Sequence, residues 1–250
     1  MGELVHNKQV TENLSSKGMK FIDNIEEAKN KVIIRSHGVT RNIYIKAKEL
    51  NIKVIDLTCP KVLKIHNIAQ DYSKDGYYIF IIGKTTHPEM IGTISFCGEY
   101  YSVIENESEI ENAVNQFKKS NKDKILIISQ TTFSLETFEN IIIKIKQRIP
   151  EEKIEIKNTI CTATKQRQEE TEKMAKQVDA MIIIGGKQSS NSNKLYELAK
   201  KYCNIVLFIE TEKELDLKTL KGINKVGVMA GASTPNESIV KVVEKLKKMC

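Results

Sequence analysis

The stretch Asp56-Leu57-Thr58-Cys59-Pro60 decides the fold, because a second copy occurs at Asn158-Thr159-Ile160-Cys161-Thr162. In each copy a cysteine stands where an apolar, strand-like run ends and a helical pattern begins; the runs are residues 52–55 and 154–156. Open α/β sheets bind ligands at this kind of junction. A helix N-terminus also stabilises a thiolate.

Three further landmarks recur at the same distance from each cysteine, with a period of 102 positions (161 − 59). A glycine that ends a strand follows its cysteine by 24 positions, a polar triplet by 28 and a hydroxyl residue by 72. Four landmarks in register indicate a duplicated α/β unit. The pairs are Gly83 with Gly185, His87-Pro88-Glu89 with Ser189-Ser190-Asn191, and Thr131 with Ser233.

An incomplete third copy opens the chain. Arg35-Ser36-His37-Gly38-Val39 follows a strand-like run at 32–34, just before the first cysteine unit, and His6-Asn7 occupies the place of the polar triplet. Repeat spacing puts a third cysteine about 22 residues before Met1. We therefore expect one strand of the first unit to be missing, which would leave a sheet edge uncovered.

Composition narrows the class of protein. The five cysteines among 250 residues are odd in number and widely spaced, which does not indicate a disulfide framework. There is no run of 18 apolar residues and no signal peptide, so we expect a cytoplasmic protein without a membrane partner. The net charge of +7 is spread over lysine-rich helix faces. The sequence has no basic cluster with interleaved aromatic residues, so it does not indicate nucleic-acid binding.

Strand-like runs alternate with helical patterns along the whole chain. This alternation predicts an α/β fold of mostly parallel sheets, with the landmarks converging at strand ends around a pseudo-threefold centre. We expect units at 1–59 (completed by a helix at 235–250), 60–160 and 161–234. The predicted strands are 32–35, 53–57, 77–82, 101–104, 124–129, 153–157, 179–184, 204–209 and 225–229, and the helices 40–51, 61–74, 107–118, 134–148, 163–177, 189–202 and 235–249.

Cys59 and Cys161 are the candidate metal ligands, and the alternative for each alone is a buried structural cysteine. Three thiolates from three repeats would suit a cubane iron–sulfur cluster with one iron left open for substrate. The other cysteines have no partner in the repeats, and we assign them no role: Cys97, Cys203 and Cys250.

The polar segments suit an anion. Ser189-Ser190-Asn191-Ser192-Asn193 and Ser233-Thr234-Pro235 both open helices, where free N–H groups and side-chain donors meet. Helix capping alone is the alternative. His6 and His37 add donors at equivalent strand ends, whereas His66 is mid-helix and is interpreted as surface or core.

The triplet His87-Pro88-Glu89 differs in character. A histidine and a carboxylate two residues apart after a strand indicate proton handling, and Thr131 could complete a relay with Glu89. The structural alternative is that Glu89 interacts with a helix N-terminus.

These residues resemble the family of 4-hydroxy-3-methylbut-2-enyl diphosphate reductases, the IspH or LytB family. The resemblance covers essentially the whole chain in family order. The matching motifs are Glu3-Leu4-Val5-His6-Asn7, Ser36-His37-Gly38-Val39, Asp56-Leu57-Thr58-Cys59-Pro60, His87-Pro88-Glu89, Ser129-Gln130-Thr131-Thr132, Ile160-Cys161-Thr162-Ala163-Thr164 with Arg167-Gln168, Ser189-Ser190-Asn191-Ser192-Asn193 and Gly231-Ala232-Ser233.

The resemblance implies a trefoil of three α/β units around one 4Fe–4S cluster. It implies reductive removal of the C4 hydroxyl from an allylic diphosphate, with two electrons from a ferredoxin- or flavodoxin-like donor. Cys59 and Cys161 would be cluster ligands. Glu89, with His87 and Thr131, would orient the substrate hydroxyl and supply protons. The diphosphate would be held by His6, His37, Ser189, Ser190, Asn191 and Ser233.

The chain departs from the family at its start, because the family's first segment, which carries a further cluster cysteine, does not occur in this sequence. One alternative is therefore a cluster-deficient remnant that binds a diphosphate without catalysis. Others are a different three-cysteine enzyme, such as one resembling quinolinate synthase or the diphthamide-forming enzyme, and a lysine-rich nucleic-acid binder.

Overall fold

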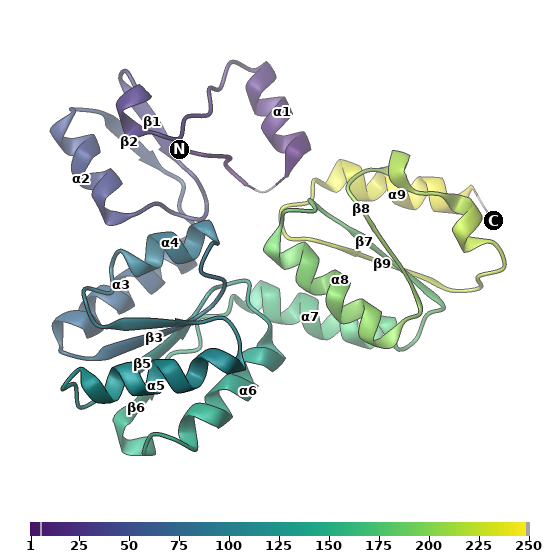
Figure 1. The fold of residues 1–250 in the computed structure, drawn as a ribbon. Helices are drawn as coiled ribbons and strands as arrows, with labels where there is room; N and C mark the ends of the chain where they lie inside the picture. The colour runs from purple at the N-terminus through teal and green to yellow at the C-terminus, as the bar shows by residue number, and fades with distance from the viewer. Residues whose placement is uncertain (6, 249–250) are drawn as a thin grey trace. The chain divides into compact units, whose positions relative to one another are not determined.

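The computed structural model of this protein describes residues 1–5 and 7–248 (Figure 1). They divide into two compact units. The first comprises Met1–Leu4 and Lys20–Cys161, and the second comprises the described residues of Val5–Met19 and Thr162–Cys250. Every strand pairing in the described sheets is parallel. The predicted α/β class is therefore confirmed.

A two-stranded sheet opens the first unit. β1 (Lys31–Ile34) pairs with β2 (Lys53–Asp56), and α2 (Arg41–Glu49) connects them. Apolar side chains remain accessible along the second strand and just beyond it, since Ile55 is 39% exposed and Leu57 is 47% exposed. This sheet is the smallest of the three in the described part of the chain.

The four-stranded sheet of the first unit is covered on both faces (Figure 1). Phe80 and Ile127 face α5 and α6, whereas Ile81 and Ile128 face α3 and α4. Because side chains alternate along a strand, strands buried on both faces read as continuous apolar runs. The order is β4-β3-β5-β6, formed by β3 (Tyr78–Ile82), β4 (Tyr101–Ile104), β5 (Ile125–Ser129) and β6 (Ile154–Ile156), with α3 (Pro60–Lys74), α4 (Pro88–Ile94), α5 (Ile110–Lys119) and α6 (Leu135–Lys146).

The second unit repeats this plan on a smaller scale. Met181 and Ile183 of the central strand pack with α7 and α8, and Ile182 and Ile184 pack on the other side with Val242 of α9. The sheet order is β8-β7-β9, formed by β7 (Ala180–Ile184), β8 (Ile205–Ile209) and β9 (Val226–Ala230), with α1 (Lys8–Ser16), α7 (Thr162–Ala175), α8 (Ser190–Tyr202) and α9 (Asn236–Lys247).

All nine predicted strands occur in the described residues, within one or two residues of the expected ends. The seven predicted helices occur as well, although the one expected at 107–118 begins with a 3₁₀ turn. Helices α1 and α4 were missed. The first buries no residue and has only Val10 and Leu14 on its apolar face, and the second has only seven residues, so the apolar pattern of each is too short to predict a helix. The 3₁₀ turns are Ile25–Glu27, Glu107–Glu109, Glu151–Lys153, Glu212–Glu214 and Leu217–Leu220.

The predicted units 1–59, 60–160 and 161–234, and their arrangement around a common centre, remain a prediction. Among residues 1–5 and 7–248, no helix has both the length and the apolar character needed to cross a bilayer.

Candidate active site

A buried carboxyl group occupies the strand ends of the four-stranded sheet. Glu89 lies in the first turn of α4 and is 2% exposed. Thr131, just beyond β5, donates twice to it: its backbone N–H to Oε1 at 2.6 Å and its hydroxyl to Oε2 at 2.6 Å. The two residues are 42 positions apart in the sequence. The sequence alone links them because Thr131 stands at the end of the repeat that contains Glu89.

Burial raises the pKa of Glu89 from 4.5 to about 7, and the hydrogen bonds from Thr131 oppose that rise only in part. Desolvation penalises the charged carboxylate, so the protonated form persists to neutral pH. A carboxyl group with such a pKa can both donate and accept a proton near pH 7.

A pair of histidine rings adjoins this carboxyl group through His87. His87 caps α4, and its Nδ1 accepts from the backbone N–H of Glu89 at 3.2 Å. The neutral ring of His87 therefore carries its proton on Nε2. The ring of His37, in the loop after β1, meets it edge to face with centroids 5.4 Å apart. The structure thus brings two predicted donors from different sheets of the first unit together.

The two predicted ligand cysteines occupy equivalent loops. The backbone N–H of Cys59 donates to the carbonyl of Ser36 at 3.0 Å, and that of Cys161 donates to the carbonyl of Thr131 at 2.9 Å. Each cysteine thus sits beside a polar residue that follows the neighbouring parallel strand. Both thiols are half-buried and free, and each directly precedes a helix, α3 or α7.

A side-chain clamp shapes each cysteine loop. Asp56 Oδ1 accepts from the backbone N–H of Thr58 at 2.9 Å, and Asn158 Oδ1 accepts from that of Ile160 at 3.1 Å. These turns lie at matched repeat positions. The first is reinforced by the Tyr44 hydroxyl, which donates to Asp56 Oδ2 at 2.9 Å. We do not predict these turns from the sequence, although Asp56 and Asn158 stand three positions before the cysteine in both copies and are the signal for them.

The predicted anion-binding residues of the second unit gather at the ends of β7 and β9. Ser189 caps α8, where its hydroxyl accepts from the backbone N–H of Ser192 at 3.4 Å. Asn191 is 4% exposed, and neither polar atom of its side-chain amide has a hydrogen-bond partner among the described residues. Ser190 is half-buried in the first turn of the same helix. This end of the helix therefore offers donors to a ligand.

Ser233 lies half-buried beyond β9, and its carbonyl accepts from the side-chain amide of Asn7 at 3.3 Å. Gly185 and Gly231 make room for Ser192, since a Cβ at either glycine would collide with its hydroxyl. His6, the remaining predicted diphosphate ligand, lies outside the described residues.

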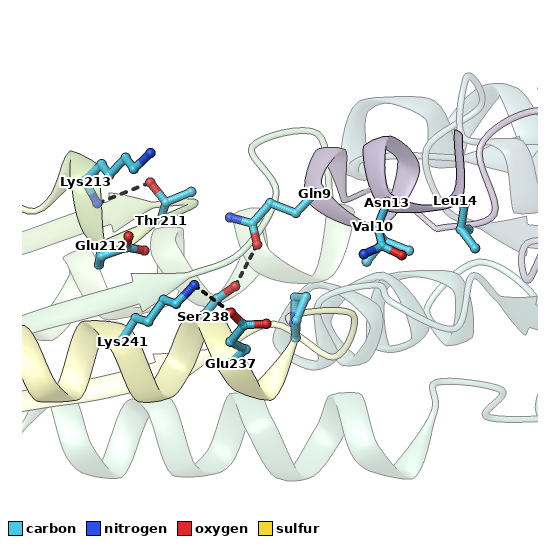
Figure 2. Close-up of a pocket in the computed structure, with 11 residues that line it drawn as sticks. Gln9, Val10, Asn13, Leu14, Thr211, Glu212, Lys213, Glu237, Ser238 and Lys241 are labelled. Atoms are coloured by element: carbon cyan, nitrogen blue, oxygen red, sulfur yellow. Dashed lines mark hydrogen bonds and ion pairs between the residues drawn. The ribbon is translucent and has the colours of Figure 1, made fainter. Parts of the chain in front are cut away.

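A cavity of about 550 Å³ lies in the second unit, and its lining includes Pro235, two residues after Ser233. Figure 2 shows it bordered by α1, the 3₁₀ turn at Glu212–Glu214 and α9. Gln9 joins its walls: Ser238 donates to its Oε1 at 2.7 Å, and its Nε2 donates to the carbonyl of Glu210 at 3.4 Å. No predicted site residue that the structure describes lines this cavity.

The sequence profile described as LytB protein matches residues 1–247. The chain belongs to the LytB family. Curated proteins named 4-hydroxy-3-methylbut-2-enyl diphosphate reductase are similar to this LytB chain over its whole length. That of Clostridioides difficile (strain 630) is 40% identical over 251 residues, covering 100% of this chain and 88% of the relative. That of Campylobacter concisus (strain 13826) is 41% identical over 254 residues, covering 100% and 89%.

Two solved structures resemble the LytB chain. One is an (E)-4-hydroxy-3-methyl-but-2-enyl diphosphate reductase, described as the terminal enzyme of the non-mevalonate pathway. It shows a TM-score of 0.69 and 34% identity over 99% of this chain and 87% of that one. The Plasmodium falciparum E-1-hydroxy-2-methyl-but-2-enyl-4-diphosphate reductase shows a TM-score of 0.90 and 31% identity, over 98% and 77%. The resemblance inferred from the motifs is confirmed.

The donor set of the LytB chain fits part of an iron–sulfur site. Cys59 and Cys161 offer two half-buried thiols, the ligand type that such clusters use. Cys97 is fully buried, with its pKa raised to about 12 by burial, and Cys203 is buried in the second unit's core. Within the part of the chain that the structure describes, no group of three or more His, Cys, Asp or Glu side chains could hold a metal ion.

Proposed function

We propose that this chain is a 4-hydroxy-3-methylbut-2-enyl diphosphate reductase. The reaction replaces the C4 hydroxyl by hydrogen: the substrate takes up two electrons and two protons and yields water with isopentenyl or dimethylallyl diphosphate. The observation that carries the proposal is the buried Glu89 carboxyl group hydrogen-bonded to Thr131, in a chain that belongs to the LytB family.

Glu89 supplies the proton that turns the substrate hydroxyl into water. Its pKa of about 7 keeps a large fraction of the group protonated at neutral pH. Thr131 holds the carboxyl group in place through two hydrogen bonds. His87 lies beside the same helix start and orients the hydroxyl with its Nε2–H. A general acid tuned toward the working pH contributes on the order of 10²–10⁴-fold to rate.

The diphosphate is held by His37, Ser189, Ser190, Asn191, Ser233 and His6. Asn191 and Ser189 are placed at the N-terminus of α8, where backbone N–H groups favour an anion. The unpartnered amide of Asn191 is a donor without another use among the described residues.

Cys59 and Cys161 would hold a 4Fe–4S cluster together with a further thiolate. When bound, such a cluster supplies electrons and a Lewis-acidic iron. The two electrons come from a ferredoxin- or flavodoxin-like donor, and the net charge of +7 suits an acidic protein partner. We place the enzyme in the cytoplasm.

The test is anaerobic reconstitution of the chain with iron and sulfide, followed by iron counting and a reductase assay. Cys59→Ser and Cys161→Ser should each remove bound iron and activity. Cys203→Ser serves as the matched control, because that cysteine lies in the second unit's core and should leave both unchanged.

Two results would separate the alternatives. A chain that binds inorganic diphosphate but never iron, even when residues from the upstream reading frame are added, supports the anion-binding remnant. A chain that binds iron independently of Cys59 and Cys161 contradicts the ligand assignment.

A further inference from the structure

His66 is a buried residue of α3, with 2% of its surface exposed. Its ring stacks on Phe96, with centroids 4.4 Å apart and planes 15° apart. Neither ring nitrogen has a hydrogen-bond partner among the described residues. The interpretation of this residue as surface or core is thus decided in favour of the core.

An imidazole is a poor choice for this position on packing grounds alone. Burying its nitrogens without partners costs stability, and a purely apolar side chain would fill the space without that cost. Burial lowers the pKa of His66 to about 4, against a smaller opposing effect of Asp56, so the ring is neutral under ordinary conditions. This position therefore holds a flat, neutral and compact ring although packing there does not require a polar group.

Two glycines are fitted to this ring. A Cβ on Gly38 would lie 2.9 Å from His66 Cε1, and a Cβ on Gly92 would lie 3.4 Å from His66 Nε2. Gly38 has φ +74°, in the left-handed region that favours glycine. The imidazole therefore touches the loop after β1 on one side and α4 on the other.

The two elements that meet at His66 carry the proposed proton-handling and anion-binding groups of the first unit. Gly38 follows His37 directly, and Gly92 lies in the helix that begins with His87 and Glu89. The rings of His37 and His87 stand 5.4 Å apart across this junction.

A second contact ties the same elements together beyond the ring. The backbone N–H of Arg41 donates to Ser95 Oγ at 2.9 Å, and that hydroxyl donates to the carbonyl of Gly92 at 2.6 Å.

We propose that His66 is a positioning residue whose ring sets the separation between the His37 loop and α4, and thereby aligns His37 with His87 and Glu89. The inference deepens the proposed function and rests on it for its effect on turnover. Its effect on geometry can be measured without turnover.

His66→Ala should move the ring signals of His37 and His87 in NMR spectra, which is a simple readout because the chain has only four histidines. It should lower kcat/KM roughly 10- to 100-fold, since displacements near 1 Å cost that much in a preorganised site. His66→Phe keeps a flat ring against Phe96 and should retain more activity and more native histidine signals than His66→Ala.

Ile65→Ala is the matched control, because Ile65 is equally buried on the same helix but, unlike His66, contributes none of the atoms nearest to Gly38 or Gly92. It should lower the melting temperature while leaving the histidine signals and kcat/KM near their original values. If His66→Ala behaves in the same way, His66 is only a packing residue and the proposal is wrong.

A compensating pair sharpens the test. Gly92→Ala places a methyl group against His66 and the carbonyl of Val39, so it should perturb the same signals. Combined with His66→Ala, that methyl group enters the vacated space and should restore part of the loss. If the losses of the two single variants simply add in the double variant, His66 does not set the separation between the His37 loop and α4, and the proposal is wrong. A parent chain without reductase activity would contradict the proposed function, while the NMR comparison would still decide the positioning.

Discussion

At the residue scale, the chemistry rests on a carboxyl group whose charge is suppressed by its surroundings. Glu89 faces Thr131 and the cap of a short helix, with no cationic partner in the interactions described for it. A buried ion without a counter-charge shifts its pKa rather than remaining charged. This makes Glu89 costly to the fold at high pH and useful as an acid near neutrality.

Glu89→Gln should change how stability depends on pH. The folded-state pKa of Glu89, about 7, lies above its ordinary value of 4.5, so folding takes up a proton between these values. The wild type therefore loses stability as the pH rises from about 4.5 through about 7, by on the order of a few kcal/mol. The variant has no such loss, so its advantage in urea unfolding should grow with pH.

Glu152→Gln, at an exposed carboxylate, is the control for removing one negative charge. An advantage of Glu89→Gln that stays constant between about pH 5 and about pH 8 would show that Glu89 is not titrating in this window. The same variant should lower reductase activity about 100-fold or more if the group is the general acid.

Thr131→Val should raise the pKa of Glu89 further, because the Thr131 hydroxyl stabilises the carboxylate form. The high-pH limb of the kcat/KM profile should then move upward, together with a loss in rate from poorer alignment. Thr131→Ser keeps the donor and should leave the limb in place. If the high-pH limb of the kcat/KM profile moves by the same amount in Thr131→Val and Thr131→Ser, a group other than Glu89 determines that limb.

At the element scale, short loops between strands and helices place the reactive side chains. The loops before α3 and α7 use the same device, an Asp or Asn that binds the backbone two residues ahead and so presents the following cysteine. Such turns are local, which explains why a duplicated sequence can reproduce them. In the first loop, Tyr44 adds a contact from α2, and burial raises its pKa to about 12.

Asp56→Ala should loosen the Cys59 loop by removing acceptors for Thr58 and Tyr44. We expect a loss of about 1–2 kcal/mol in unfolding free energy and weaker iron retention during chelator challenge. Tyr44→Phe removes only one of the two contacts and should give a smaller effect. Equal iron retention by Asp56→Ala and the wild type would show that the loop holds its shape without the clamp.

Gly231→Ala should destabilise the second unit, because the added methyl group would collide with the hydroxyl of Ser192. Overpacking of this kind costs about 1–3 kcal/mol. The affinity for inorganic diphosphate should fall as well, measured by calorimetry. Ser192→Gly in the same chain removes the collision and should restore stability. Failure of this rescue would mean that the glycine is needed for its backbone rather than for space.

At the scale of the whole molecule, each compact unit carries one part of the proposed machinery. The first holds both cysteines and the Glu89 group, and the second holds the serine and asparagine donors. Most of the net charge of +7 belongs to the second unit, which has 18 Lys and Arg against 12 Asp and Glu, whereas the first has 21 against 20.

If electrons arrive from an acidic protein, their delivery should depend on salt. The Debye length shrinks from about 10 Å at 0.1 M to about 3 Å at 1 M ionic strength, so steering of the donor should weaken. Turnover with a reduced ferredoxin- or flavodoxin-like donor should slow across this range, whereas turnover with an uncharged chemical reductant should change little. Equal slopes for the two reductants would argue against electrostatic docking.

The sequence by itself determined the alternation of nine strands with helices, the family, and the loops in which the reactive side chains stand. These features depend on local periodicity and on motifs that repeat at fixed spacing, so they can be read along the chain. The sequence did not predict helices α1 and α4 because both are short: the apolar face of α1 consists of Val10 and Leu14, and α4 has only seven residues.

Only the tertiary structure decided which side chains touch. The double hydrogen bond from Thr131 to Glu89, the meeting of His37 with His87, and the burial of His66 between two glycines all join segments far apart in sequence. Their energies depend on desolvation and on distance, which the order of residues does not contain. The repeats and motifs identify the candidate residues in the sequence. Burial in the folded protein raises the pKa of Glu89 to about 7, which suits its proposed role as an acid.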